Sequence, residues 1–264
     1  MVTNYTVLVI GCLKHEEIAD RYFKLANIYW NDSLKNTIFC TDRITNYQRS
    51  FSPTIVSETI SSFANRILSG LELIKTDYVI LLLDDYYLTK KINQESLKNL
   101  ILYMKKANIE YCKLVGMPKC FSKNKEYNGT FHIKKQTHYG VSLQPSVWKK
   151  TALVEALNNC NGHSAWEVEA AFSIYQKNNY KKCLTFNKNF LHYHNGVLRG
   201  KLFPYTNKLL RKNNIDPLDI EVISHFQSFV FMTRQHLSMH LPIWLRKIGK
   251  KIGMKKGKKY YTTD

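Results

Sequence analysis

The run DYVILLLDD, residues 77–85, decides the fold of this chain. Its apolar part carries hydrophobic side chains on both faces, which is typical of a central strand in a parallel sheet that helices cover on both sides. The run ends in two neighbouring carboxylates, which repel each other unless a positive charge lies between them. A divalent metal ion is one such charge, and a solvated turn is the alternative.

Strand and helix patterns alternate around this run. Short β-branched runs predict strands at 5–12 and 36–42, and a polar helical stretch ends at about Trp30. Apolar residues at helical spacing predict helices at 57–76 and 93–109. This alternation predicts the α/β class, with a doubly wound, mostly parallel sheet.

The second half of the chain has weaker patterns. We expect a polar loop or short hairpin at 119–137, then a strand, a proline turn and a helix within 138–157. A helix is predicted at 162–178, and 183–202 is predicted to be extended and to end in a glycine-rich basic loop. Residues 206–264 are expected to form a helical, basic extension.

Composition and charge narrow the possible partners and the compartment. The 264 residues carry a net charge of +19, which favours an anionic partner: nucleic acid, an acidic membrane face or a phosphorylated substrate. Six cysteines without a CxxC pair predict reduced thiols in the cytoplasm. No stretch approaches the length of about 18 apolar residues that a membrane-spanning helix needs, and the first residues lack the basic start of a signal peptide. We therefore expect a soluble or peripheral protein.

Three aspartates follow predicted strands. Asp42, Asp84 and Asp85 stand at carboxyl ends, where open α/β sheets bind ligands, although an aspartate after a strand is also a common turn residue. The chain has neither the GxGxxG nor the GxxxxGK[ST] pattern. A bound nucleotide would therefore rely on a metal ion and basic side chains to hold its phosphates.

The segment HSAWEVEAAF, residues 163–172, has two interpretations. Ser164 and Glu167 match a capping box, which would explain Glu167 by itself. Alternatively, Glu167 or Glu169 faces a pocket and acts as a general base toward a hydroxyl. Trp166 would then form an apolar wall beside a sugar ring, with core packing as its alternative.

Two further segments carry candidate ligands. In LHYHNG, residues 191–196, an extended backbone places His192 and His194 on one face, where they could bind a metal. In NGVLRGK, residues 195–201, Arg199 and Lys201 suit a diphosphate, and a solvated basic turn is the alternative.

Over residues 5–205 the chain resembles glycosyltransferases of the GT-A fold, most closely bacterial enzymes of capsule and O-antigen assembly, including some that move galactofuranose. The resemblance rests on YTVLVIGC, FCTD, the helix with Asn65 and Arg66, LLLDDYYL, VSLQPSVWKK, WEVE and HYHNGVLRGK. It implies a Rossmann-like sheet flanked by helices, with a donor half at about 1–110 and an acceptor half at about 111–205.

The resemblance also implies a metal centre. Members of this family bind Mn²⁺ or Mg²⁺ through a D-x-D motif at the end of a central strand. Asp84 and Asp85 occupy that place, although Leu83 precedes the pair and the strict spacing is absent. Asp85 is the favoured metal ligand, Asp84 lies nearer the donor ribose or sugar, and His192 or His194 completes the shell.

The remaining implied roles follow the family pattern. Glu167 is the first choice for the catalytic base and Glu169 the second, while Asp42 contacts the nucleoside. The other donor contacts are Asn65, Arg66, Arg199 and Lys201, and the acceptor or sugar wall is Trp166 and Tyr86. The implied reaction is an inverting transfer from a UDP-sugar to a hydroxyl of a lipid-linked oligosaccharide.

The C-terminal segment 241–264 combines an apolar stripe with eight basic residues and one acid. This pattern predicts an interfacial helix on an anionic membrane, although its glycines weaken a helix. We therefore expect a protein on the inner face of the cell membrane, held by Trp244, Arg246, Lys247, Lys250 and Lys251. A disordered basic tail and a nucleic-acid arm are the alternatives.

Two other functions fit parts of the pattern. A metal-dependent nuclease or nucleic-acid-binding protein would use the basic surface, the carboxylate pair and the two histidines. The basic residues do not interleave with aromatic ones as in known nucleic-acid modules, so no nucleic-acid partner is expected. A non-catalytic membrane scaffold would keep the tail and tolerate Asp85→Asn and Glu167→Gln.

Overall fold

The structure is a computed structural model of the chain. It describes residues 5–12, 16–42, 54–57, 62–117, 122–158, 160 and 164–240, and also residues 244, 245, 248, 251 and 254. Three of the predicted membrane residues, Arg246, Lys247 and Lys250, lie outside the described residues.

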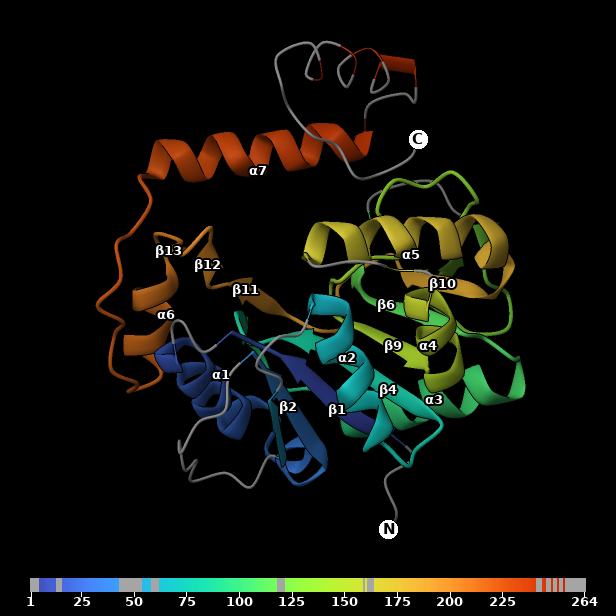
Figure 1. Cartoon of the computed structure of the whole chain (residues 1–264), viewed down its shortest axis with the longest axis horizontal. Helices are drawn as coiled ribbons and strands as arrows, with labels where there is room; N and C mark the ends of the chain where they lie inside the picture. Colours follow the sequence, from blue (N-terminus) through green and yellow to red (C-terminus); the bar gives the residue numbers. More distant parts are fainter. Residues whose placement is uncertain are drawn as a thin grey trace.

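A nine-stranded sheet forms the centre of the molecule, in the order β3-β2-β1-β4-β9-β6-β10-β8-β7 (Figure 1). The first four strands of this order run parallel to one another, β9 runs antiparallel to both of its neighbours, and β10 is parallel to β6. The strands are β1 (Tyr5–Ile10), β2 (Thr37–Thr41), β3 (Thr54–Ser57), β4 (Tyr78–Leu83), β6 (Tyr111–Gly116), β7 (Ser122–Lys123), β8 (Thr130–His132), β9 (Ser146–Lys149) and β10 (Cys183–Phe186).

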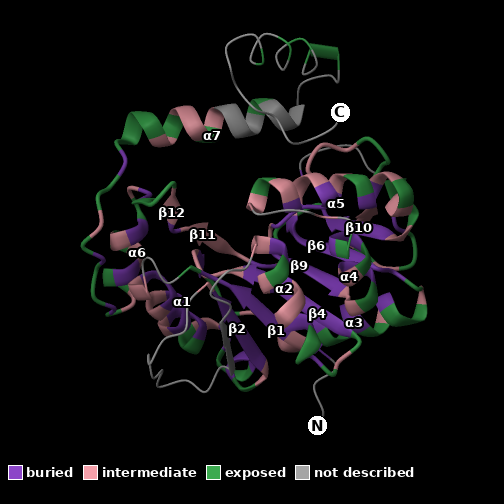
Figure 2. Ribbon diagram, in the orientation of Figure 1, coloured by how far each residue is buried: buried purple, intermediate pink, exposed green. Residues whose placement is uncertain are grey.

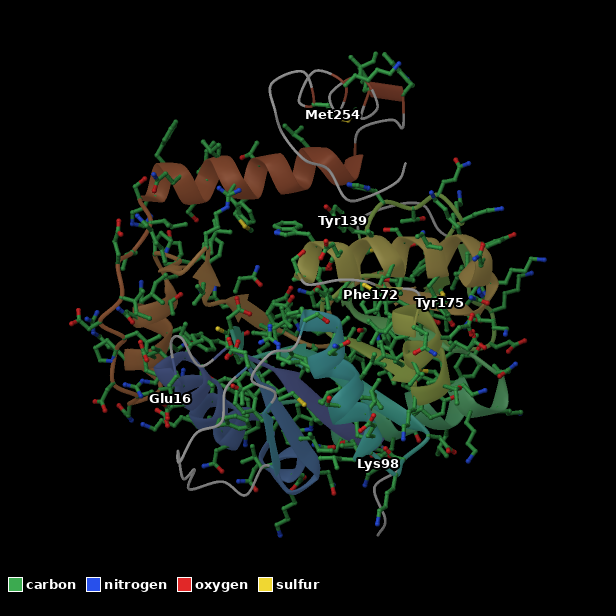
Figure 3. All side chains as sticks on the ribbon, viewed as in Figure 1. Glu16, Lys98, Tyr139, Phe172, Tyr175 and Met254 are labelled. Carbon is green, nitrogen blue, oxygen red and sulfur yellow. The ribbon has the colours of Figure 1, made fainter. Side chains whose placement is uncertain are left out.

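Helices cover both faces of this sheet, and Figure 2 shows the buried strands between them. One core holds buried residues of α1, α3 and α6, and the other holds those of α2, α4 and α5. In Figure 3, Phe172 and Tyr175 of α5 belong to the second core. The helices are α1 (Glu16–Tyr29), α2 (Phe63–Glu72), α3 (Gln94–Lys106), α4 (Lys150–Asn158), α5 (Ala165–Asn179), α6 (Thr206–Lys212) and α7 (His225–His240), with short 3-10 turns at Asn31–Asn36 and Tyr180–Lys182.

Alternate residues of the central strands enter opposite cores. Val7 and Val9 of β1 belong to the α1 side, whereas Leu8 and Ile10 belong to the α2 side. This is the period of two that a strand imposes on its side chains. Because both faces are apolar and covered, polar groups of these strands can reach a ligand only at the strand ends.

Two small sheets lie beside the carboxyl ends of the central strands. β5 (Tyr86–Leu88) continues from β4 after a turn at Asp84 and Asp85, and it pairs antiparallel with β11 (Tyr193–Asn195). The second small sheet joins β12 (Val197–Leu198) to β13 (Lys201–Leu202). The carboxylate pair and the two predicted histidines, more than a hundred residues apart in the sequence, are thereby brought to the same side of the molecule.

The predicted α/β class is confirmed, with a mostly parallel central sheet flanked by helices. The hairpin at 119–137 is present as the β7–β8 pair. The strand predicted before the proline turn was placed wrongly, because β9 follows Pro145 instead of preceding it. Proline has no N–H to donate to a neighbouring strand, so it fits before a strand better than inside one. The carbonyl of Pro145 still accepts a hydrogen bond from the Leu114 N–H.

The sequence patterns also left β6 unassigned and made 183–202 one extended segment, whereas the structure divides that range among β10, β11, β12 and β13. The divisions between 1–110, 111–205 and 206–264 stay predictions. The first part of the extension packs into the core that contains α1 and α3, because Leu210, Ile215 and Leu218 are buried there. Among the described helices, none is both long enough and apolar enough to span a bilayer.

The packing of α2 on the sheet gives a first test. A Cβ atom at Gly70 would lie 2.5 Å from Cys40 Sγ and 2.6 Å from Leu8 Cδ1. We expect Gly70→Val to lower the free energy of unfolding by about 1–3 kcal/mol, because the larger side chain forces α2 away from β1 and β2. Urea unfolding followed by circular dichroism measures the change.

The matched control is Glu72→Val, the same new side chain at an exposed position of the same helix. Its midpoint should stay close to that of the parent chain. Equal midpoints for the parent and Gly70→Val would show that the contact between α2 and the sheet is not as tight as described.

Candidate active site at the carboxyl edge of the sheet

The ends of β1, β2 and β4 are tied together by hydrogen bonds at one edge of the sheet. The backbone N–H of Asp84 donates to Ile10 O at 3.1 Å, and the N–H of Cys12 donates to Asp84 Oδ2 at 3.3 Å. The Cys12 thiol donates to Asp42 Oδ2 at 3.1 Å. The two predicted carboxylates at 42 and 84 therefore lie around the same turn, as expected for parallel strands that end together.

Gly11 is required at this turn by a close approach. A Cβ atom there would lie 2.4 Å from Asp84 Oδ2 and 2.6 Å from the Phe39 ring. Arg66, from α2, reaches the same turn and donates from Nη1 to Gly11 O at 2.7 Å. The Nε of Arg66 is buried and has no hydrogen-bond partner among the described residues. Asn65, beside it, is exposed.

Asp85 lies in the turn between β4 and β5, in an environment unlike that of a solvated turn. Burial of its carboxyl group raises its pKa to about 7, and backbone hydrogen bonds from its own N–H and from Val197 oppose that rise. The main chain is held from the same side, because the N–H of Gly196 donates to Asp85 O at 2.7 Å. Asp85 is therefore partly buried, and its role as a metal ligand stays a prediction.

The two histidines lie near this turn but have contacts of their own. His194 stands opposite Tyr87 in the β5–β11 register, and its Nε2 is 3.1 Å from Thr206 Oγ1. Burial lowers the pKa of His194, and burial and Lys90 lower that of His192. The described residues hold no cluster of three or more His, Cys, Asp or Glu side chains arranged for a metal ion. A histidine ligand stays a prediction, and Asp84 and Asp85 remain the two candidate protein ligands.

The predicted diphosphate loop forms the connection between β12 and β13. Arg199 is exposed and adopts a left-handed backbone conformation with φ of 53°. Lys201 is exposed and pairs with Glu221 at 2.5 Å, so its ammonium group already has an anionic partner. Its role as a phosphate ligand stays a prediction, and donor binding would have to compete with that ion pair.

The capping-box interpretation of Glu167 is confirmed. Its Oε2 accepts hydrogen bonds from the Ser164 N–H at 2.9 Å and from the Ser164 hydroxyl at 3.1 Å. The neighbouring Trp166 is 59% exposed, so the core-packing alternative for that residue is wrong. Its role as a wall for a sugar stays a prediction.

Glu169 is placed differently, one half-turn further along α5. It is partly buried, and its Oε1 accepts a hydrogen bond from the Leu143 N–H at 2.8 Å. The Tyr86 hydroxyl donates to the carbonyl of the same Leu143 at 3.4 Å, and the ring of Tyr86 packs on that of Tyr193 at 4.7 Å between centroids.

The pKa values of Tyr86 and Tyr193 depend on the charges of both Asp85 and Glu169. The charges of these two carboxylates both contribute to raising the pKa of Tyr86 and of Tyr193, although burial is the largest cause. Tyr86 follows Asp85 directly in the chain and bonds to the residue that Glu169 also contacts. The structure therefore joins Tyr86, the neighbour of Asp85 in the chain, and Glu169 through Leu143, whereas Glu167 is held at the helix terminus.

Sequence reasoning missed Lys113 of β6. This lysine is 1% exposed, and its Nζ donates to Tyr139 O at 2.5 Å. Burial lowers its pKa to about 7, and the charge of Glu169 opposes that shift. Burial likewise raises the pKa of Glu169, against the effects of Leu143 and Lys113. The signal was a single lysine inside the apolar run YCKLVG, but that run was not assigned to a strand.

The buried lysine gives a test of this electrostatic coupling. We expect Lys113→Met to raise the pKa of Glu169, because the variant removes a positive charge that favours the ionised carboxylate. Carbon-13 NMR titration of labelled glutamate carboxyl groups, assigned with Glu169→Gln, measures the value. Lys105→Met, at an exposed lysine that pairs with Asp77, is the control and should leave it unchanged. A Glu169 pKa that stays constant or falls in Lys113→Met would contradict the coupling.

No protein-family model and no curated protein sequence matches this chain. Among solved structures, a cytidylyltransferase from Leptospira borgpetersenii serovar Hardjo-bovis aligns with a TM-score of 0.47 and 12% identity, over 92% of this chain and 99% of the other. S. aureus TarS 1-349 in complex with UDP-GlcNAc aligns with a TM-score of 0.49 and 12% identity, over 80% and 65%. A mannosyltransferase from Pyrobaculum calidifontis in complex with GDP-Man and Mn²⁺ aligns with 0.47 and 15%, over 74% and 58%. All three TM-scores are below 0.5, too low to assign chemistry to this chain.

Proposed function

We propose that this chain is a metal-dependent inverting glycosyltransferase, which moves a sugar from a nucleoside diphosphate donor to a hydroxyl group. The observation that carries the proposal is that Glu169 and Tyr86, which follows Asp85 directly in the chain, bond to the same residue, Leu143, beside the edge where the central parallel strands end. In this proposal Asp85 binds a cation, and Glu169 accepts a proton. Two such groups beside a ligand edge are the minimum that this reaction requires.

The carboxylate pair fits a divalent cation. Burial disfavours the ionised form of Asp85, and the bonds that oppose this come from backbone groups. A cation beside Asp84 and Asp85 would favour the ionised form directly. Mg²⁺ and Mn²⁺ are commonly held by one or two carboxylates, with water and substrate phosphates completing the shell, so two protein ligands suffice. When bound, the metal would neutralise charge on the leaving diphosphate.

The donor is placed by the residues around the same turn. Asp42, which accepts a bond from the Cys12 thiol, would contact the nucleoside, and the guanidinium of Arg66, which bonds to Gly11 O, would contact a phosphate. Asn65 and Arg199 are exposed and able to contribute further contacts. UDP is the preferred nucleotide because of the resemblance to GT-A enzymes of surface polysaccharide assembly. The same resemblance favours a lipid-linked oligosaccharide as the acceptor.

Glu169, rather than Glu167, is the base in this proposal. Glu167 accepts two hydrogen bonds from Ser164 and caps α5, whereas Glu169 adjoins the tyrosine pair beside Asp85. Glu169 takes the proton of the acceptor hydroxyl, and that oxygen forms a bond to the anomeric carbon. The bond from this carbon to the diphosphate oxygen breaks on the opposite face, and its electron pair leaves with the diphosphate. The configuration at the anomeric carbon is inverted.

Donor binding can be tested without knowing the sugar. We expect UDP with Mn²⁺ to raise the melting temperature of the chain, because a ligand that binds only the folded state stabilises it. The rise should need both components and should be lost in Asp85→Asn. Differential scanning fluorimetry measures it, with GDP, CMP and a short DNA duplex as parallel ligands.

Asp77→Asn is the matched control, because Asp77 is an exposed aspartate just before β4 that pairs with Lys105. It should keep the full response to UDP and Mn²⁺. A response only to DNA, weakening with added salt, would reject the transferase in favour of a nucleic-acid function. No response to any nucleotide would favour a scaffold.

The choice of base predicts a second difference. We expect Glu169→Gln to lower turnover about 10²–10⁴-fold, the usual contribution of a general base. Glu167→Gln should leave turnover nearly unchanged and lower the free energy of unfolding by up to about 1 kcal/mol, because it weakens a helix cap. The release of UDP from UDP-sugars, with Mn²⁺ and lipid-linked glycan acceptors, measures turnover. The reverse pattern would make Glu167 the base.

A further inference from the structure

Helix α7 contacts the rest of the molecule through aromatic rings, and several of its described residues are exposed. The ring of Phe231 lies 5.9 Å from that of Phe203, and the ring of His225 lies 5.7 Å from that of Tyr205. In Figure 1 the helix runs along the outside of the molecule, beyond β12 and β13 and beyond α5. One side of α7 is therefore held, and the other side is available to a partner.

The free side of α7 and the residues after it carry a concentration of apolar side chains. Of the fifteen large hydrophobic residues that are exposed in the described part of the chain, eight lie between 226 and 254. Phe226 is 75% exposed and Phe229 is 68% exposed. The others are Met232, Leu237, Trp244, Leu245, Ile248 and Met254. Isolated exposed apolar residues are common, but a concentration of this kind is typical of an interaction site.

The apolar residues from α7 and the following described positions stay on the outside of the molecule. Met254 lies beyond α7, on the side away from the sheet (Figure 3). We call the eight exposed residues together the C-terminal apolar surface. It is separate from both cores, which take up no residue beyond Ile223 in the described part of the chain.

The charge of the same region identifies the partner. Residues 224–264 contain nine Lys and Arg residues and a single acid, Asp264. Lys251, the basic residue described between Ile248 and Met254, is exposed. An apolar surface within a basic segment of the chain complements a bilayer whose headgroups are anionic, because aromatic and aliphatic side chains enter the acyl boundary while lysines remain at the phosphates. Trp244 suits the boundary between the two regions.

We propose that the C-terminal apolar surface, including α7 from Phe226 onward, docks the chain on an anionic lipid bilayer. The sequence predicted a membrane segment at 241–264 only. The proposal adds α7, whose own composition is not basic enough to predict membrane binding. The docking does not depend on the proposed activity. If the proposed activity also holds, α7 brings the candidate site close to the bilayer, because Phe203 lies between Phe231 of α7 and His194, at 5.9 Å and 6.1 Å.

Vesicle flotation of the full chain tests the docking. The chain should float with phosphatidylcholine vesicles that contain a quarter phosphatidylglycerol, and about tenfold less of it should float with phosphatidylcholine alone. The double variant Phe226→Ser/Phe229→Ser should reduce flotation on the anionic vesicles about tenfold, because serine contributes no apolar surface to the acyl boundary. Raising the salt to 1 M should also weaken binding, since the lysines are then screened.

The matched control is Leu102→Ser/Ile174→Ser, which removes two similarly exposed apolar residues from α3 and α5. Its flotation should equal that of the parent chain. Equal flotation of the parent chain and Phe226→Ser/Phe229→Ser would overturn the proposal for α7, and equal flotation on neutral and anionic vesicles would overturn the choice of lipid. A dimer in sedimentation equilibrium that the same double variant dissociates, without vesicle binding by the parent chain, would assign the surface to a second copy.

Fluorescence provides a readout that does not depend on the double variant folding. Vesicles with brominated acyl chains should quench the tryptophan fluorescence of the parent chain, and the quenching should fall in Trp244→Phe. Trp30 and Trp148 are buried, so the exposed Trp166 is the relevant comparison, and Trp166→Phe should keep the quenching. Quenching that persists in Trp244→Phe and falls in Trp166→Phe would place the bilayer on α5 and overturn the proposal.

Discussion

The burial of both faces of β1 and β4 is the constraint on which the rest of the structure depends. Successive residues of these strands enter two separate apolar cores, one under α1, α3 and α6 and the other under α2, α4 and α5. A strand that is apolar on both sides can present polar groups only beyond its ends. The carboxyl edge, with Asp42, Asp84 and Asp85, is the consequence of that burial.

At this edge the molecule keeps ionisable groups in surroundings that disfavour their charge. Burial raises the pKa of Asp85 and Glu169 and lowers that of Lys113, and each of these shifts costs stability at neutral pH. Groups of this kind tend to cluster where a protein binds or reacts, because ordinary packing would replace them with apolar residues. Asp85, Glu169 and Lys113 therefore mark a candidate functional site.

After α6, the chain first contributes residues to a core and then exposes apolar residues at the surface. The loop after α6 contributes Ile215 and Leu218 to the core that contains α1 and α3 and is tied to α1 by the bond from Arg21 Nε to Asp216 O at 2.8 Å. From Phe226 onward, eight of the described apolar side chains are exposed.

The sequence by itself determined the class of fold, the central strand and the edge at which the three aspartates lie, since these follow from local patterns: a run apolar on both faces, helical spacing, and carboxylates after strands. It could not assign β6, place β9 or choose between Glu167 and Glu169. Those depend on which distant segments pack together, and the pairing of β5 with β11 and the contact of Leu143 with both Tyr86 and Glu169 join residues far apart in the chain. Only the tertiary structure decided that Glu167 caps a helix while Glu169 accepts a bond from Leu143, because a side chain's charge and hydrogen bonds are set by the segments folded around it.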